Sequence, residues 1–205
     1  MTDDREAIEK LIRTAFSEQD HSRAATLAIE HYGPELLGFL ISQLRDADAA
    51  SEVFADFSAN FWAALPTFEW RCSARTFAYK LARCAAARHR RTERRRKRVT
   101  PLEHASQFSL AIERVRTATH AYKRTDVKDR FQELRAQLPD EDQSLLILRV
   151  DRGLSWLELA EVMLEGEELA SEAQLKTEAA RLRKRFQLAK EKLRALIVEA
   201  GLLES

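Results

Sequence analysis

The chain has 205 residues, of which 45% are hydrophobic and 33% are charged, and its formal net charge is +1. This composition fits a soluble protein with one large or two small domains, and two cysteines and five scattered histidines argue against a disulfide framework or a zinc site. Because the sequence has no apolar run near the length of about 18 residues that a membrane span needs, and no signal-peptide pattern, we expect no membrane insertion and a cytoplasmic location.

The first part of the chain is predicted to be helical. Apolar residues recur every three or four positions in Asp3–Ser17, and a second helix is predicted over Ser22–His31. Gly33 and Pro34 then predict a break, after which a third helix is expected over Glu35–Leu44.

The next predicted helix, Asp48–Leu65, has two contrasting faces. Its core face carries Val53, Phe54, Phe57, Phe61 and Leu65. Its other face carries three carboxylates at i, i+4 and i+8, with a tryptophan at the border: Asp48, Glu52, Asp56 and Trp62. Such a face is either plain solvent surface or a contact surface for a basic partner, and the helix alone leaves both interpretations open.

A short loop, Pro66–Ser73, follows and carries Phe68, Trp70 and Arg71. Large aromatic side chains in a loop are more often core plugs than binding groups. Beside a basic helix, however, they could also receive unstacked bases.

The segment Cys72–Arg98 begins as an amphipathic helix and ends as a dense run of arginine and lysine. One side of the helix carries Phe77, Leu81, Cys84 and Ala85. The opposite side, with its aromatic residue expected to be exposed among cations, carries Thr76, Tyr79, Arg83, Ala86 and Arg90. This pattern is typical of nucleic-acid binding, where cations neutralise phosphates and rings stack on bases, but a solvated charged helix end would look the same.

After Arg98 the apolar pattern weakens, and residues 99–125 are predicted to be a polar linker that could hold a helix near Ser109–Tyr122. Ser155 is a predicted N-cap, and the helices expected in this half are Asp126–Gln137, Ser144–Val150, Trp156–Leu164 and Gln174–Glu199. Because no strand alternation appears, the fold class is predicted to be all-α, with two small helical domains at 1–98 and 126–205.

The second domain has the helix–break–helix pattern of a helix-turn-helix module, with a basic final helix. Three residues of that helix, Thr177, Arg181 and Lys184, would read base edges in the major groove. The alternative is a packing helix with a solvated basic face.

Several segments together resemble a known family. The runs YGPELLGFLISQLRDADAASEVFADFSANFWAAL and PTFEWRCSARTFAYKLARCAAARHRR closely resemble the first domain of extracytoplasmic-function sigma factors of bacterial RNA polymerase. The runs LPDEDQSLLILRVDRGLSWLELAEVML and EAARLRKRFQLAKEKLR resemble their second domain, a four-helix domain with a helix-turn-helix. The resemblance covers about Tyr32 to Leu193 apart from the linker.

The resemblance implies a function and assigns residues to it. The polymerase-binding residues, which would meet the clamp helices of the largest subunit, are Asp48, Glu52, Asp56 and Trp62. The residues that would capture the opened minus-ten promoter element are Phe68, Trp70, Arg71, Ser73, Arg75, Thr76, Tyr79, Lys80, Arg83 and Arg90. The residues that would read the minus-thirty-five element are Thr177, Arg181, Lys184, Arg185 and Gln187. Further implied partners are the flap of the second-largest subunit and an anti-sigma factor, and no cofactor or metal is expected.

The sequence also departs from the family pattern. Ser51 stands where an acid is common, and its phosphorylation is a hypothesis for restoring the missing charge. Phe77 replaces a usual tryptophan and Cys84 a usual asparagine, so the base preference stays open. About ten residues, Glu165–Gln174, form an insertion between the two helix-turn-helix helices.

Two other classes of function are alternatives to this one. A free-standing helix-turn-helix repressor or activator would explain the final helix, but not the acidic helix or the loop aromatics. An enzyme is not expected, because the sequence has no phosphate-cradling glycine loop, no metal cluster and no nucleophile–histidine arrangement.

Overall fold

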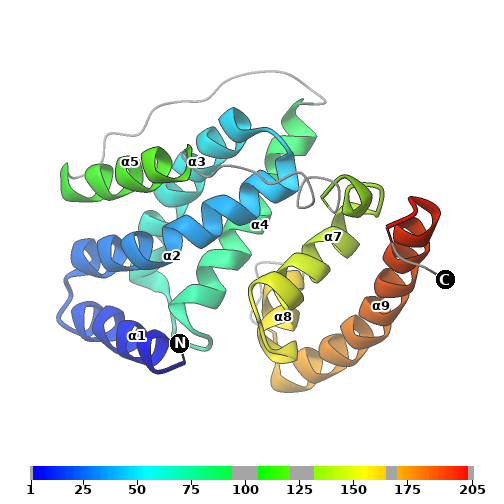
Figure 1. Cartoon of the computed structure of the whole chain (residues 1–205). Helices are drawn as coiled ribbons and strands as arrows, with labels where there is room; N and C mark the ends of the chain where they lie inside the picture. The colour runs from blue at the N-terminus through cyan, green and yellow to red at the C-terminus, as the bar shows by residue number, and fades with distance from the viewer. Residues whose placement is uncertain (1, 94–105, 121–131, 165–169, 203–205) are drawn as a thin grey trace. The chain divides into compact units, whose positions relative to one another are not determined.

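The structure is a computed structural model that describes residues 2–93, 106–120, 132–164 and 170–202. All regular secondary structure in these residues is helical, so the predicted all-α class is confirmed (Figure 1). The chain divides into two compact units, Met1–Tyr122 and Lys123–Ser205, which are described separately below. No helix among the described residues is long and apolar enough to cross a membrane.

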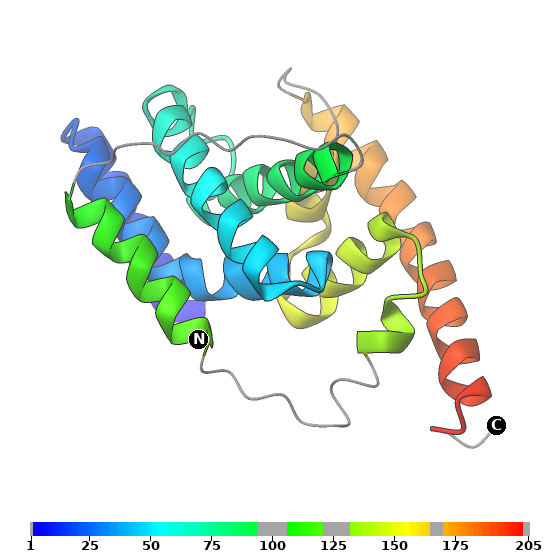
Figure 2. The same ribbon diagram turned by 90° about the horizontal axis from the view of Figure 1, so that it is seen from above.

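The first unit is organised around its longest helix, α2. Its helices are α1 (Thr2–Ser17), α2 (His21–Leu44), α3 (Ala47–Ala64), α4 (Ala74–Glu93) and α5 (Ser106–His120), with a short 3-10 turn at Leu65–Thr67 after α3. Helix α2 packs against all four others and lies between α1 and α5, as Figures 1 and 2 show. Its contacts with every neighbour make it the central element of this core.

Helix α2 runs without interruption through Gly33 and Pro34, so the predicted break there is wrong. A proline disfavours the helical conformation of the preceding residue partly through a clash with that residue's Cβ, which Gly33 lacks. Buried side chains continue on both sides of the proline: Ile29 and Tyr32 before it, and Leu36, Leu37 and Leu40 after it. Packing along the whole helix therefore stabilises it across the lost hydrogen bond.

Helix α5 confirms the helix considered near Ser109–Tyr122, but it packs on the core instead of lying in a linker. Its buried residues are Phe108, Ala111, Ile112 and Val115. They face α2 and α3, where the Phe108 ring lies 4.8 Å from the Trp62 ring. At Gly33, a Cβ atom would lie only 2.7 Å from Cγ2 of Val115, so the missing side chain permits this close approach. The first unit thus extends past the predicted boundary at residue 98.

The second unit begins in the described residues with a helical turn at 132–135. It continues with α7 (Asp140–Leu146), a π-helical turn at Ile147–Asp151, α8 (Trp156–Met163) and α9 (Glu172–Glu199). Its buried core includes Leu145, Leu148, Leu159, Val162 and Leu182. The three helices and the π-helical turn therefore enclose one small apolar core.

Capping boxes define the starts of α8 and α9. The Ser155 side chain accepts the Glu158 backbone N–H, and the Glu158 carboxylate accepts the Ser155 backbone N–H, which confirms the predicted N-cap. Ser171 and Gln174 form the same motif, so α9 begins two residues earlier than predicted. Residues 165–169 of the predicted insertion lie outside the described residues.

Candidate functional site: acidic, aromatic and basic surfaces

The three carboxylates predicted on one face of α3 are exposed there. Asp48, Glu52 and Asp56 follow one another at four-residue spacing, and Asp46 begins the helix by accepting the backbone N–H groups of Asp48 and Ala49. Exposed carboxylates spaced in this way form a continuous acidic stripe along the helix. We call Asp48, Glu52 and Asp56 the acidic stripe.

The neighbouring residues of α3 have structural roles. Trp62 is only partly exposed, because its ring packs against Phe108 of α5. Ser51 is 7% exposed, and its hydroxyl accepts a hydrogen bond of 2.6 Å from Nε of Arg116. A buried hydroxyl that already holds an arginine of α5 does not fit a phosphorylation site, so the hypothesis for Ser51 is not supported.

The loop between α3 and α4 holds its aromatic residues in a row of rings. Phe68 stacks on Phe77 with ring centroids 4.5 Å apart, and Trp70 lies 5.0 Å from Phe68 and 5.4 Å from Phe16 of α1. Trp70 adopts a positive φ of 58°, which is uncommon for a residue with a side chain, and its buried indole N–H has no acceptor among the described residues. Phe68 and Trp70 are half-buried, so each is partly a core plug and partly surface.

Helix α4 buries several residues that were expected to be exposed, and it exposes part of the side predicted to carry its larger apolar residues. Thr76 and Tyr79 are fully buried and Ala86 is almost so, whereas Phe77 and Leu81 are partly exposed and Cys84 is exposed. The physical reason is the row of small residues on the buried face, which lets α4 approach α2 and α3 closely: Ala74, Ala78, Ala82, Ala85 and Ala86. The expectation that Thr76 and Tyr79 point to solvent is therefore wrong.

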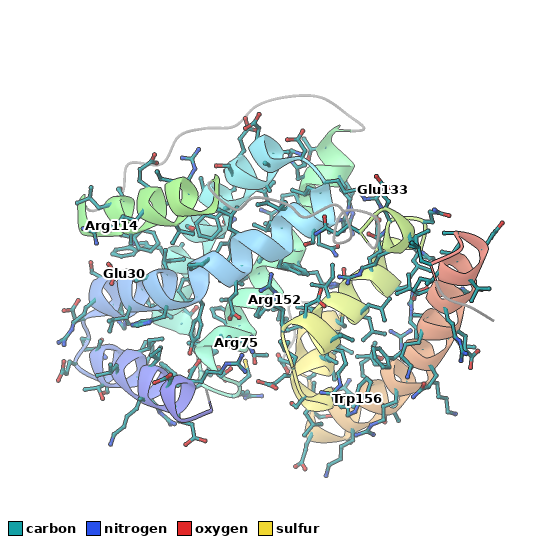
Figure 3. The ribbon with its side chains drawn as sticks, in the orientation of Figure 1. Glu30, Arg75, Arg114, Glu133, Arg152 and Trp156 are labelled. Carbon is teal, nitrogen blue, oxygen red and sulfur yellow. The ribbon has the colours of Figure 1, made fainter. Side chains whose placement is uncertain are left out.

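Arg75 is part of the core rather than of the surface. It is 5% exposed, donates two hydrogen bonds of 2.6 and 2.9 Å to the Glu35 carboxylate, and lies over the Tyr79 ring. Figure 3 labels it at the N-terminal end of α4. Two charges removed from water need such close pairing to offset the loss of hydration, so Arg75 serves to join α4 to α2.

A carboxylate of α1 holds the same end of α4. Glu9 accepts the backbone N–H groups of Ala74 and Arg75 at 2.9 and 3.0 Å, and the Tyr32 hydroxyl at 2.9 Å. Burial, with the negative charge of Glu9 beside it, raises the pKa of Tyr32 far above its ordinary value, so this hydroxyl remains a donor. Glu9 thus satisfies the first two backbone donors of α4, while the Ser73 hydroxyl caps the next turn locally by accepting the Thr76 backbone N–H at 3.0 Å.

The remaining residues predicted to contact the minus-ten element vary in exposure. Arg71 is exposed and pairs with Glu69 at 3.0 Å, and the Ser73 hydroxyl shares a hydrogen bond with Thr76. Three basic residues of α4, Lys80, Arg83 and Arg90, are partly exposed. Residues 94–98 of the basic run lie outside the described residues.

The residues predicted to read DNA lie along α9 but differ in their environment. Thr177, Lys184 and Gln187 are exposed. Arg181 is exposed too, yet it forms a bidentate pair with Glu178, which raises its pKa. Arg185 is partly buried and pairs with Glu141 and Asp142 of α7. The structure thus brings Thr177, Lys184 and Gln187 together on an open face, whereas Arg185 joins two helices.

Sequence reasoning missed two clusters. Glu9 and Arg13 lie in α1, outside the segments that resemble a known family, and nothing in their spacing marks them. In the second unit, Arg149 and Arg183 lie over the ring of Trp156 at 4.7 and 5.5 Å; Figure 3 labels Trp156. That arrangement joins the π-helical turn Ile147–Asp151, α8 and α9 by cation–π contacts.

A comparison with protein-family models gives one match, and it covers α3, the aromatic loop and α4. The model described as Sigma-70 region 2 matches residues 28–96, from within α2 to just beyond α4. Residues 28–96 are therefore a sigma-70 region 2 domain. Region 2 supports a role in RNA polymerase binding and promoter recognition, and both the acidic stripe and the aromatic loop lie within the matched residues. A search of curated proteins finds no match to the chain.

Proposed function

We propose that the chain is an alternative sigma factor of the extracytoplasmic-function type, which binds core RNA polymerase and directs promoter recognition, melting and the start of transcription. The observation that carries the proposal is the acidic stripe, Asp48, Glu52 and Asp56, exposed on α3 within the region 2 match. Its three carboxylates fit the basic clamp helices of the largest polymerase subunit. It is a binding and specificity subunit, and we assign it no catalytic residue.

The opened minus-ten strand would follow the exposed side of α4 and the adjoining loop. The residues that fit this path are Phe68, Trp70, Phe77, Lys80, Cys84, Arg88 and Arg91, which are exposed or half-exposed. Extruding a base costs a few kcal/mol, and stacking it on an aromatic ring returns about 1–3 kcal/mol. Arg75, Thr76 and Tyr79 would support this surface from beneath, because they are buried.

The second unit would read the minus-thirty-five element as a helix-turn-helix formed by α8 and α9. Thr177, Lys184 and Gln187 would face the bases, because they share the open face of α9. Arg181 would exchange Glu178 for DNA, and Arg185 would hold α9 against α7. The flap of the second-largest polymerase subunit and an anti-sigma factor would be further partners, and the cytoplasm would be the site of action.

Charge reversal on α3 tests the proposal. We expect Glu52→Lys combined with Asp56→Lys to weaken binding to core RNA polymerase at least tenfold, because like charges would then face the clamp helices. Fluorescence anisotropy of the labelled full-length protein titrated with core polymerase measures the affinity, and circular dichroism checks the fold. The matched control, Glu6→Lys with Glu199→Lys, reverses two exposed carboxylates elsewhere and should bind normally. Equal affinity of the α3 variant and wild type would contradict the clamp assignment.

The alternative function, a free-standing repressor or activator, rests on the second unit alone. It predicts tight and specific binding of the isolated chain to duplex DNA. The sigma-factor proposal predicts promoter opening only after core polymerase is added. A gel-shift assay with and without core polymerase distinguishes the two. Sequencing the transcripts that rise after overexpression would supply the promoter DNA for it.

A further inference from the structure

One face of α1 is directed at the aromatic loop, although α1 precedes the residues that the region 2 model matches. Glu9, Ile12, Arg13 and Phe16 follow the helical spacing of one face. Ile12 is fully buried, and the Phe16 ring lies 5.4 Å from the Trp70 ring. The Arg13 guanidinium lies over the same indole, 5.5 Å from its centroid. The loop is therefore bounded on one side by α1.

The position of α1 relative to the loop is fixed by Glu9. Its carboxylate accepts two backbone N–H groups at the start of α4 and the hydroxyl of buried Tyr32. These three hydrogen bonds connect α1, α2 and α4 at one point. Arg13 lies one helical turn beyond Glu9, so its backbone is held at a defined place beside Trp70.

Three arginines surround the loop, and they differ in their partners. Arg71 pairs with Glu69 and Arg75 pairs with Glu35. Arg13 is exposed and makes no ion pair with any described residue, and its described contact is the face of Trp70. A guanidinium that stacks on an aromatic face keeps its in-plane N–H donors available, and these donors match the oxygens of a phosphate. An unneutralised cation beside half-exposed rings is the arrangement found where proteins hold single-stranded nucleic acid.

We propose that Arg13 is a phosphate-binding residue for single-stranded DNA, and that α1 thereby extends the promoter-strand surface beyond region 2. The proposal rests on the proposed function, since the strand is the opened minus-ten strand. A base stacks on the row of rings formed by Phe68, Trp70 and Phe77, and Arg13 binds the strand's backbone where it passes Trp70. The ligand is a phosphodiester, and the contact carries no sequence information of its own.

The test compares three variants of the full-length protein in complex with core RNA polymerase. The probe is a fluorescently labelled single-stranded DNA of mixed sequence, and anisotropy gives its affinity over a series of salt concentrations. Arg13→Met keeps an apolar stem against Trp70 but removes the charge. We expect its affinity to fall several-fold and the slope of log affinity against log salt to become shallower by about 0.7, the value for one phosphate on a single strand. Arg13→Lys should keep the wild-type slope.

The control is Arg23→Met, which removes an exposed arginine paired with Glu18 at the start of α2. It should leave the slope unchanged, and circular dichroism should show native helix content for all variants. A wild-type slope in Arg13→Met, or failure of Arg13→Lys to keep that slope, would overturn the Arg13 assignment alone. If wild-type protein adds no affinity for the probe beyond that of core polymerase, both the assignment and the proposed function fall.

Discussion

At the scale of single residues, the junction of α1, α2 and α4 depends on Glu9. A carboxylate at a helix N-terminus satisfies orphan backbone donors and interacts favourably with the helix dipole. Here the carboxylate comes from another helix, so one side chain caps α4 and fixes α1 in the same step. Tyr32, which is 4% exposed, depends on Glu9 as the acceptor of its hydroxyl group.

Replacing Glu9 should therefore destabilise the first unit. In Glu9→Ala the Tyr32 hydroxyl loses its acceptor in a buried position and two backbone donors lose their cap. We expect the free energy of unfolding to fall by about 2–3 kcal/mol, the order of a lost cap together with an unsatisfied buried group. Urea unfolding of the full chain, followed by circular dichroism, measures this. Glu6→Ala, an exposed position on the same helix, should change stability by less than about 0.5 kcal/mol, and equal losses would argue against the capping role.

At the scale of helices, periodicity predicted where most elements lie but not always which face is buried. The acidic stripe of α3 and the cap of α8 follow from local sequence, because spacing and capping are local properties. In α4, however, the core face is built from alanine, threonine and tyrosine, while Phe77 packs on the loop at the edge. Large apolar residues are therefore a poor guide to the buried face of α4, because close helix packing favours small side chains there.

The docking of α5 on α2 could not be predicted, because it depends on a long-range contact. Local sequence rules treat Gly33 as a helix breaker. In the fold, its missing side chain lets Val115 of α5 pack directly against α2. The candidate surfaces show the same difference between local and long-range information. The spacing of Asp48, Glu52 and Asp56 predicts one exposed acidic face of α3. The roles of Glu9 and Arg13 depend on α1 packing against the loop, which the sequence does not indicate.

Replacing Gly33 tests the contact between α2 and α5. A Cβ at this position would lie 2.7 and 3.2 Å from the two Cγ atoms of Val115, whose branched side chain has little freedom to move. We expect Gly33→Ala to destabilise the first unit by about 1–3 kcal/mol, although alanine is the better helix former. In the double variant with Val115→Ala the clash disappears, so the two changes should be strongly non-additive. Additive losses in urea unfolding would show that α5 does not approach α2 this closely.

At the scale of the whole molecule, the boundary between the two units decides which fragment can fold alone. The first unit ends at Tyr122, and its core includes α5, whereas the sequence pattern predicts a domain end at residue 98. Without α5, the chain would expose the face of α2 around Gly33 together with Trp62 and Ser51 of α3. That face would then be an exposed, largely apolar surface next to the acidic stripe.

A comparison of two fragments tests this boundary. Burying Phe108, Ile112 and Val115 is worth at most about 1.5–3 kcal/mol each, part of which is offset by the entropy lost when α5 becomes ordered. We therefore expect fragment 1–98 to be less stable than fragment 1–122 by about 2–4 kcal/mol, a large share of the roughly 5–15 kcal/mol that a domain has. Urea unfolding by circular dichroism measures the difference. The variant Phe108→Ala in fragment 1–122 should lie between the two, because it removes the ring that packs on Trp62 but leaves the rest of α5. Equal stability of the two fragments would mean that α5 adds nothing to the core, and the shorter domain would then be the folding unit.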